Sequence, residues 1–318
     1  MMRQLTGVAL LFLAALAHAQ SYPSRPVRVL IAFAGGGLAD LIARALTDRM
    51  SPALGQPFVL ENRPGAGGNI AMEAVVRGPH DGHTLLMIGP AAAINGALYR
   101  NLAFSPAKDL APIGVMGWGP YAMFVSSTVP VTSAAELVAY AKANPGKLNY
   151  ASVGVGSGGH LTGVLFAMAA GVQMTHVPYK GIQAIAPDIV SGEVHVVFNA
   201  FGPLNAFVQA GKVKLLAVTS AERLPAYPDV PSLSESALPG FDATGWYVLF
   251  APAGTPRPVL ERLNAELRSA LADRDTVQKI EKAGMRPVAQ TLDEAARFMT
   301  AETDKWGRAV RASGAAAE

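Results

Sequence analysis

The chain has 318 residues, a formal net charge of +3 and no cysteine. The absence of thiols excludes disulfides and cysteine-based metal sites, and basic residues that are scattered singly argue against a nucleic-acid partner. A chain of this length exceeds what one hydrophobic core usually serves, so we expect two domains of ordinary size.

Residues 1–19 have the features of an export signal. Arg3 gives a positive start, residues 5–16 form an apolar run, and the small residues Ala17 and Ala19 frame a cleavage site. The apolar run is shorter than the roughly 20 residues that a bilayer core requires. We therefore predict cleavage after Ala19 and a mature protein in the periplasm.

From residue 27 onward, short apolar runs alternate with amphipathic segments, as in α/β proteins whose mostly parallel sheets are flanked by helices. We expect the first strand at residues 27–33 and a helix from Leu38, because apolar residues then recur at helical spacing. Further buried strands are predicted at residues 58–61, 85–88, 148–152, 174–177, 195–198 and 215–218. The pattern predicts an α/β fold built from repeated strand–helix units.

Local signals mark several other elements. Ser133 and Glu136 form a capping box at the start of a helix. Residues 224–241 are rich in Pro and Ser and have little periodicity, which predicts a long surface connection before a strand at residues 246–251. We expect two helices after that strand.

The run of strand–helix units occurs twice, before about Tyr121 and again in the middle of the chain. This repetition predicts two similar lobes. If the apolar segments 121–125 and 246–250 connect them, the first lobe consists of residues 20–122 and 245–318, and the second of residues 123–244. Two such connections form a hinge.

A glycine-rich loop follows the first predicted strand. Gly35, Gly36 and Gly37 open the first helix, where unpaired amides and the helix dipole favour an anion that glycine lets approach closely. This arrangement indicates an anion-binding loop. A tight turn in which Asp40 only offsets the helix dipole explains the same residues, and both interpretations remain open.

A second glycine-rich loop follows the strand at residues 148–152. Gly154, Gly156 and Gly159 match the dinucleotide pattern G-x-G-x-x-G, but no acidic residue stands roughly 20 positions further on to hold a ribose. We therefore expect no cofactor. Ser152 and Ser157 can instead donate hydrogen bonds to a carboxylate.

Other polar residues end predicted strands on the second lobe. Tyr179 and Asn199 are candidate contacts at the edge of a cleft between the lobes. Histidines are scattered without ligand spacing, so we predict no metal site. Ser157, His160 and Asp188 could be drawn as a hydrolytic triad, but the loop lacks the complete G-x-S-x-G pattern, and we expect no catalysis.

Several ordered stretches match a known family over essentially the whole length after the signal: residues 22–26, 33–40, 54–57, 61–69, 147–152, 176–181 and 249–256. On these residues the chain resembles the Bug (TctC) family, the extracytoplasmic binding proteins of tripartite tricarboxylate transporters. The resemblance implies a two-lobed Venus-flytrap fold of type II and a small carboxylate held between the lobes, partly through water. It also implies docking to the membrane subunits of a transporter. We expect a monomer.

The predicted ligand site combines both loops with their neighbours: Phe33, Gly35, Gly36, Leu38, Ala39, Asp40, Gly89, Ala91, Ser152, Gly154, Gly156, Ser157, His160, Tyr179 and Asn199.

The sequence departs from the common family pattern at several of these positions. Leu38 and Ala39 stand where a small residue and then Thr are frequent, Asn199 stands where Asp is common, and the loop at residues 89–93 is more apolar than usual. These changes favour a carboxylate whose other end is less polar than citrate, either aromatic or short aliphatic. A dicarboxylate or tricarboxylate ligand stays open. So do a sensory role for the same fold and a periplasmic hydrolase.

Overall fold

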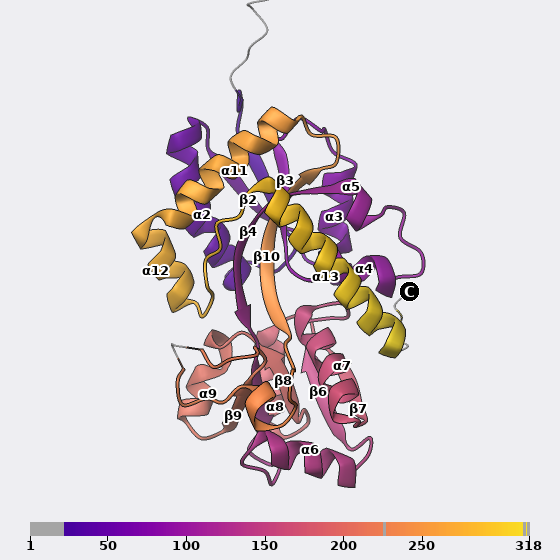
Figure 1. Cartoon of the computed structure of the whole chain (residues 1–318). Helices are drawn as coiled ribbons and strands as arrows, with labels where there is room; N and C mark the ends of the chain where they lie inside the picture. Colours follow the sequence, from indigo (N-terminus) through magenta and orange to yellow (C-terminus); the bar gives the residue numbers. More distant parts are fainter. Residues whose placement is uncertain (1–21, 225–226, 314–315, 317–318) are drawn as a thin grey trace, which may run out of the picture.

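Two sheets, each with helices on its faces, form the two lobes of the protein (Figure 1). The computed structural model describes residues 22–224, 227–313 and 316. The predicted export signal lies outside these residues. The strand orders are β2-β1-β3-β10-β4 in the first sheet and β7-β6-β8-β5-β9 in the second. The expected two-lobed α/β fold is therefore confirmed.

The first sheet contains strands from both ends of the described chain: β1 (Val27–Ile31), β2 (Phe58–Asn62), β3 (Thr84–Ile88), β4 (Leu110–Pro120) and β10 (Thr244–Pro252). Strands β2, β1 and β3 are parallel, whereas β10 runs antiparallel to both β3 and β4. Strand β1 ends at Ile31, two residues before the predicted end, so Phe33 belongs to the glycine loop.

The second sheet contains only strands from the middle of the chain: β5 (Ala122–Ser126), β6 (Leu148–Ser152), β7 (Met174–Pro178), β8 (Val196–Asn199) and β9 (Val213–Val218). Strands β7, β6 and β8 are parallel, and β5 is antiparallel to β8 and β9. Each sheet is thus mixed. Its parallel half follows the predicted strand–helix units, and the reversed strands β10 and β5 lie next to the connections between lobes.

Helices cover both faces of the sheets. The first lobe has α2 (Leu38–Leu54), η1 (Ala66–Gly68), α3 (Asn69–Val76), α4 (Ala91–Leu98), α5 (Pro106–Asp109), α11 (Arg257–Ala272), α12 (Arg274–Lys282) and α13 (Leu292–Ser313). The second has α6 (Ala134–Ala143), α7 (Gly158–Ala170), α8 (Ile182–Ser191), η2 (Gly202–Leu204), α9 (Asn205–Gln209) and α10 (Leu233–Ser236). None of the described helices combines the length and the apolar character that a membrane crossing needs.

The end of the chain differs from the prediction of two helices. Within the described residues three helices follow β10, because Asp273 ends α11 and its carboxylate also caps α12 by accepting the Thr276 amide at 3.1 Å. The predicted capping box is present at α6. Ser133 accepts the Glu136 amide at 3.1 Å, while the Glu136 carboxylate accepts the amide of Thr132 at 2.6 Å.

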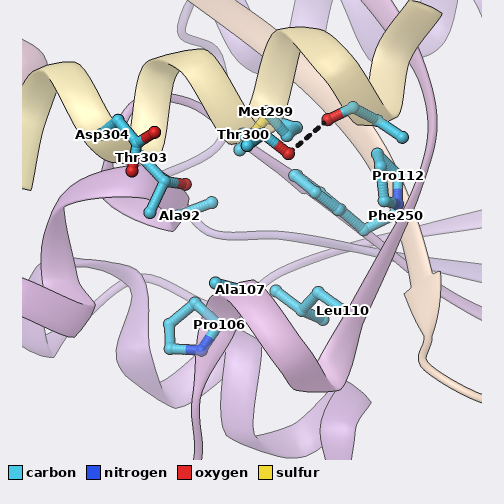
Figure 2. Close-up of a pocket in the computed structure, with 11 residues that line it drawn as sticks. Ala92, Pro106, Ala107, Leu110, Pro112, Phe250, Met299, Thr300, Thr303 and Asp304 are labelled. Atoms are coloured by element: carbon cyan, nitrogen blue, oxygen red, sulfur yellow. Dashed lines mark hydrogen bonds between the residues drawn. The ribbon is translucent and has the colours of Figure 1, made fainter. Parts of the chain in front are cut away.

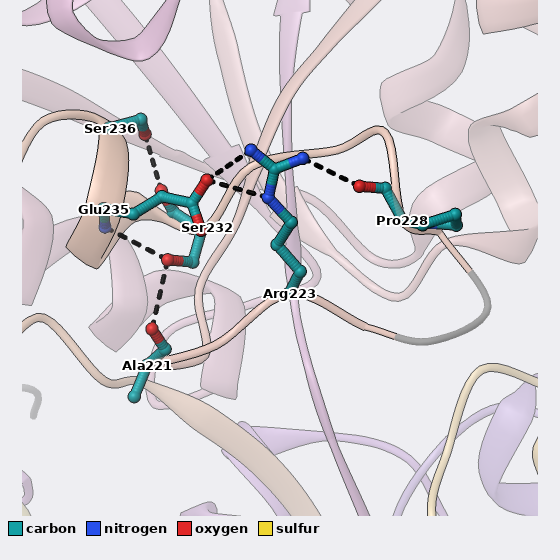
Figure 3. Close-up of polar contacts among 6 residues, drawn as sticks. All are labelled: Ala221, Arg223, Pro228, Ser232, Glu235 and Ser236. Carbon is teal, nitrogen blue, oxygen red and sulfur yellow. Dashed lines mark hydrogen bonds and ion pairs between the residues drawn. The ribbon is translucent and has the colours of Figure 1, made fainter.

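The segment after β9 is more ordered than the predicted surface connection. It contains α10, and the side chains of Leu233, Leu238 and Phe241 are buried in the core of the second lobe. Arg223 anchors its start by bonding the Glu235 carboxylate and, at 2.8 Å, the carbonyl of Pro228 (Figure 3). The sequence pattern did not predict that these apolar side chains are buried, because one short helix and a turn are too short to give a hydrophobic periodicity.

The chain crosses between the lobes at two neighbouring points. Pro120 pairs with Thr244 at the end of the β4–β10 ladder. The fully buried Thr219 hydroxyl accepts the Tyr121 amide at 2.9 Å and donates to the Ala243 carbonyl at 2.6 Å, so it joins both crossings. The apolar segments that we expected to be the connections are instead strands inside the sheets, β5 and β10. The exact domain boundaries stay a prediction.

Helix α13 extends from the first lobe onto the second. It packs against α4 and β4 and also against α7. Its fully buried Trp306 belongs to the same core cluster as Leu161 of α7. The buried Glu302 carboxylate fixes the helix, because one of its oxygens accepts the indole N–H groups of Trp246 at 2.7 Å and Trp306 at 2.8 Å.

We predict that Glu302→Ala destabilises the protein by roughly 2–4 kcal/mol, because two buried indole donors lose their acceptor. Urea denaturation measures the change in the free energy of unfolding. Asp304→Ala, at an exposed position on the same helix, is the matched control and should change it by less than about 0.5 kcal/mol. Equal effects of the two substitutions would contradict this role for Glu302.

Candidate functional site

The first glycine loop leads from β1 into the N-terminus of α2. Gly35, Gly36 and Gly37 are exposed, and Gly36 has a left-handed backbone with φ of 76°. A side chain at Gly36 would meet no atom within 4 Å. The space beside this backbone is therefore open to a bound molecule. The Asn62 amide supports the loop by donating to the Phe33 carbonyl at 3.0 Å.

Asp40 lies in the first turn of α2 and is buried. The hydrogen bond from Arg44, 2.9 Å away, holds the pKa of this carboxyl below its usual value, and the Gly36 amide and Asn62 lower it further. The carboxylate is charged and already has partners, so it fits the interpretation that Asp40 offsets the helix dipole. The neighbouring Leu38 and Ala39 pack against the core of the first lobe.

The second glycine loop leads from β6 into α7. The Ser152 hydroxyl donates to the Gly154 carbonyl at 2.9 Å, and the Ser157 hydroxyl donates to the same carbonyl at 2.7 Å. A hydroxyl has one hydrogen, so both serines use theirs to shape the loop and not to face a ligand. The donors left at this end are backbone amides. Gly158 and Gly159 begin α7 and have no partner four residues earlier in the helix.

Three rings lie beneath this loop. His160 and His176 have ring centroids 4.0 Å apart, and Tyr150 lies 4.9 Å from His176. The Gly156 amide donates to Nδ1 of His160 at 3.2 Å, and Nε2 of His176 is 2.7 Å from the Ser152 hydroxyl. Burial lowers the pKa of His160 to about 4 and that of His176 to about 3, with a smaller effect of His160 on His176. Both rings are neutral at neutral pH and support the loop.

The end of β3 adds an apolar wall to the site. Gly89 and Ala91 are buried, and a side chain at Gly89 would lie 2.9 Å from the Trp246 carbonyl and 3.7 Å from the Tyr247 ring. The rings of Phe33 and Tyr247 meet edge to face with centroids 5.9 Å apart. Phe33 and Gly89 thus come together around an aromatic side chain that the sequence reasoning missed.

The two lobes touch at the second glycine loop. A side chain at Gly67 in the first lobe would place its first carbon 2.7 Å from the Val155 carbonyl, and one at Gly156 would lie 2.8 Å from Oδ1 of Asn95. Asn95 is fully buried, and this oxygen has no hydrogen-bond partner among the described residues. Only residues without side chains fit at these two positions while the lobes are in contact.

Two predicted contact residues each have a side-chain oxygen that is bonded within the second lobe. The Tyr179 hydroxyl donates to the Asp188 carboxylate at 2.5 Å, and Oδ1 of Asn199 accepts the Ala200 amide at 2.8 Å. Burial, reinforced by Asp188, raises the pKa of Tyr179 to about 12. Because Asp188 bonds Tyr179 and the Ser157 hydroxyl donates to a carbonyl, Ser157, His160 and Asp188 do not form a hydrolytic triad in this structure.

Outside the glycine loops the structure has a pocket on the first lobe, and the described residues contain no metal-binding cluster. No group of three or more His, Asp and Glu side chains could hold a metal ion among these residues. The pocket lies on the first lobe between α5, β4, β10 and α13 and is lined by Leu110, Phe250, Met299 and Thr300, among others (Figure 2). It is mainly apolar, contains neither glycine loop, and its Thr300 hydroxyl already donates to the Ala296 carbonyl.

Comparison with known proteins identifies the family. The model of the tripartite tricarboxylate transporter family receptor, TctC, matches residues 42–315. The chain belongs to this family. A relative from a Pseudomonas species, called UPF0065 protein in tcbD-tcbE intergenic region, is 35% identical over 97% of this chain and 93% of its own length. The Bug (TctC) resemblance is therefore confirmed.

Solved structures of the family share the fold. Rpa4515 of R. palustris with adipate has a TM-score of 0.86 and 33% identity over 93% of this chain and 99% of that one. The periplasmic binding protein BugD has a TM-score of 0.83 and 32% identity over 93% and 100%. MatC from Rhodopseudomonas palustris with bound malate has a TM-score of 0.81 and 33% identity over 91% and 100%. TctC receptors of this kind are solute-binding proteins, and this chain has their architecture.

We predict that the protein loses stability as the pH falls from about 6.5 to about 4. In this pH range the unfolded chain protonates its histidines, whereas His160 and His176 stay neutral in the native state, so protonation favours unfolding. Melting temperature measured between pH 7 and pH 4 should fall, and less steeply in His176→Gln. His80→Gln, at an exposed position, is the control and should keep the wild-type slope. An unchanged slope in His176→Gln would contradict the assignment.

Proposed function

We propose that this chain is a periplasmic solute-binding protein that captures a small carboxylate between its lobes and delivers it to the membrane subunits of a tripartite tricarboxylate transporter. One observation carries the proposal: glycine-rich loops on both lobes, at Gly35–Gly37 and Gly154–Gly158, each open a helix at the end of a parallel strand. Such helix N-termini offer backbone amides and positive potential to an anion. Adipate and malate in the related structures have the corresponding chemistry.

In this proposal the backbone, and not the serine hydroxyls, binds the carboxylate. Glycine amides need no charged side chain beside them, and the ends of strands in open α/β sheets are where ligands commonly bind. The first amides of α7, at Gly158 and Gly159, fit this role best, and Gly35 is the candidate in the first loop. The amides of Gly36, Gly154 and Gly156 already bond Asp40, Ser152 and His160, so these glycines contribute the close approach of the backbone. Ser152, Ser157 and His160 then act by holding the second loop in place.

The ligand that we favour has an end less polar than citrate, because the rings of Phe33 and Tyr247 meet beside Gly89, next to the first loop. Export through the predicted signal at residues 1–19 would bring the protein to the periplasm. A sensory role would use the same ligand chemistry with a different partner protein. The engaged side chains of Ser157 and Asp188 disfavour a hydrolase.

A thermal-shift panel of mono-, di- and tricarboxylates and aromatic acids tests the proposal directly. A ligand at about 100 times its dissociation constant should stabilise the protein by roughly 2.7 kcal/mol. We expect at least one acid to raise the melting temperature and matched uncharged amides to leave it unchanged. A panel without any response would overturn carboxylate binding.

Gly36→Val should abolish acid binding, because its branched side chain fills the open space beside the loop amides. Gly55→Val is the matched control, since Gly55 ends the same helix with φ of 69° and a side chain there would also meet no atom within 4 Å. Both variants should lose roughly 1–3 kcal/mol of stability from backbone strain. Titration calorimetry should show lost binding only for Gly36→Val, and retained binding there would remove the first loop from the site.

A further inference from the structure

Two tyrosines that the sequence reasoning missed lie between the glycine loops. Tyr121 is the residue at which the chain crosses from β4 to β5. A side chain at Gly158, the first residue of α7, would place its first carbon 1.8 Å from the Tyr121 hydroxyl oxygen, and one at Gly245 would lie 2.6 Å from it. The ring therefore occupies space that two glycines leave free, and its hydroxyl reaches the start of α7.

Tyr247 reaches the same region from the first lobe. Residues 245 and 247 of β10 point to the same face of the sheet, because side chains alternate along a strand. Tyr121 packs against β10 at Gly245, so Tyr247 lies on the same face of the sheet as Tyr121. The Tyr247 ring contacts Phe33, which precedes the first glycine loop. The two phenols are close enough that Tyr247 contributes to the raised pKa of Tyr121.

The chemistry of both hydroxyls is that of neutral donors. Burial is the main cause that raises the pKa of Tyr121 and the only one that raises the pKa of Tyr247, and no lysine or arginine contributes to either. Neither hydroxyl has a hydrogen-bond partner within the described part of the chain. A partly buried phenol without a partner leaves a donor that a ligand can satisfy.

We propose that the hydroxyls of Tyr121 and Tyr247 donate hydrogen bonds to an acceptor group at the end of the ligand remote from its carboxylate, an inference that rests on the proposed function. The carboxylate would bind the glycine amides, and the aromatic faces of Phe33 and Tyr247 would cover the apolar middle of the ligand. The site then selects acids that carry a second hydrogen-bond acceptor, such as a ring hydroxyl or a second carboxyl group, over acids that end in a methyl group.

Titration calorimetry with matched acids tests this inference. The pairs are para-hydroxybenzoate with para-toluate, and adipate with hexanoate, so that within each pair only one member offers a remote acceptor. Wild-type protein should bind the acceptor member of at least one pair more tightly. Tyr121→Phe and Tyr247→Phe should each weaken binding of that member by roughly tenfold and leave the methyl-ended member unchanged. Tyr140→Phe, on the outer helix α6, should change neither.

The outcomes separate this inference from the proposed function. If wild-type protein binds these acids without preferring an acceptor member, or if both phenylalanine variants keep the preference, the tyrosine assignment is wrong while carboxylate binding stands. An equal loss for both members of a pair would also contradict it, since that result indicates altered packing. If no acid binds in this set or in the wider panel, both proposals fail. Melting temperatures of the unliganded variants check that each one folds.

Discussion

The pairing of β10 with β4 is the constraint on which the two-lobed arrangement depends. These long antiparallel strands pair from Leu110–Pro252 at one end to Pro120–Thr244 at the other. At the Pro120–Thr244 end the chain leaves the first lobe after β4 and returns to it before β10. Thr219 then joins the two crossings through a single hydroxyl. Because both crossings are neighbours, the two covalent connections between the lobes lie at one short edge, and the glycine loops on either side can approach a common space.

The proposed site relies on backbone donors and not on charged side chains. The acidic and hydroxyl side chains nearest the loops are occupied: Asp40 by Arg44, and Ser152 and Ser157 by the Gly154 carbonyl. They stiffen two loops that lead into helix N-termini, where the first amides of each helix have no acceptor within the helix. A preorganised set of amides can bind an anion without first losing side-chain entropy.

The periodic parts of the structure could be predicted from sequence, and the tertiary contacts of single residues could not. Apolar runs located most of the strands, including the partly exposed β2 and β7, but they missed β4 and gave β5 only as a connection between the lobes. The glycines after β1 and β6 located the loops. Tyr121 and Tyr247 gave no local signal, because each belongs to an apolar run that contains other aromatic residues, such as Phe124 and Trp246. Their place follows only from glycines distant in sequence, such as Gly158 and Gly89, that leave room for their rings. The sequence also did not show what the hydroxyls of Ser152 and Ser157 bond, since both donate to the Gly154 carbonyl, which comes within reach only in the folded loop.

Contact between Gly67 and the Val155–Gly156 turn affects the rate at which a bound molecule can leave. With so little room between them, a molecule enclosed by the two lobes has no exit at this seam until the lobes separate. The dissociation rate would then depend mainly on how often the lobes separate, and less on the strength of the hydrogen bonds between the amides and the anion. A partner that pulls the lobes apart could trigger unloading without competing for the cargo itself.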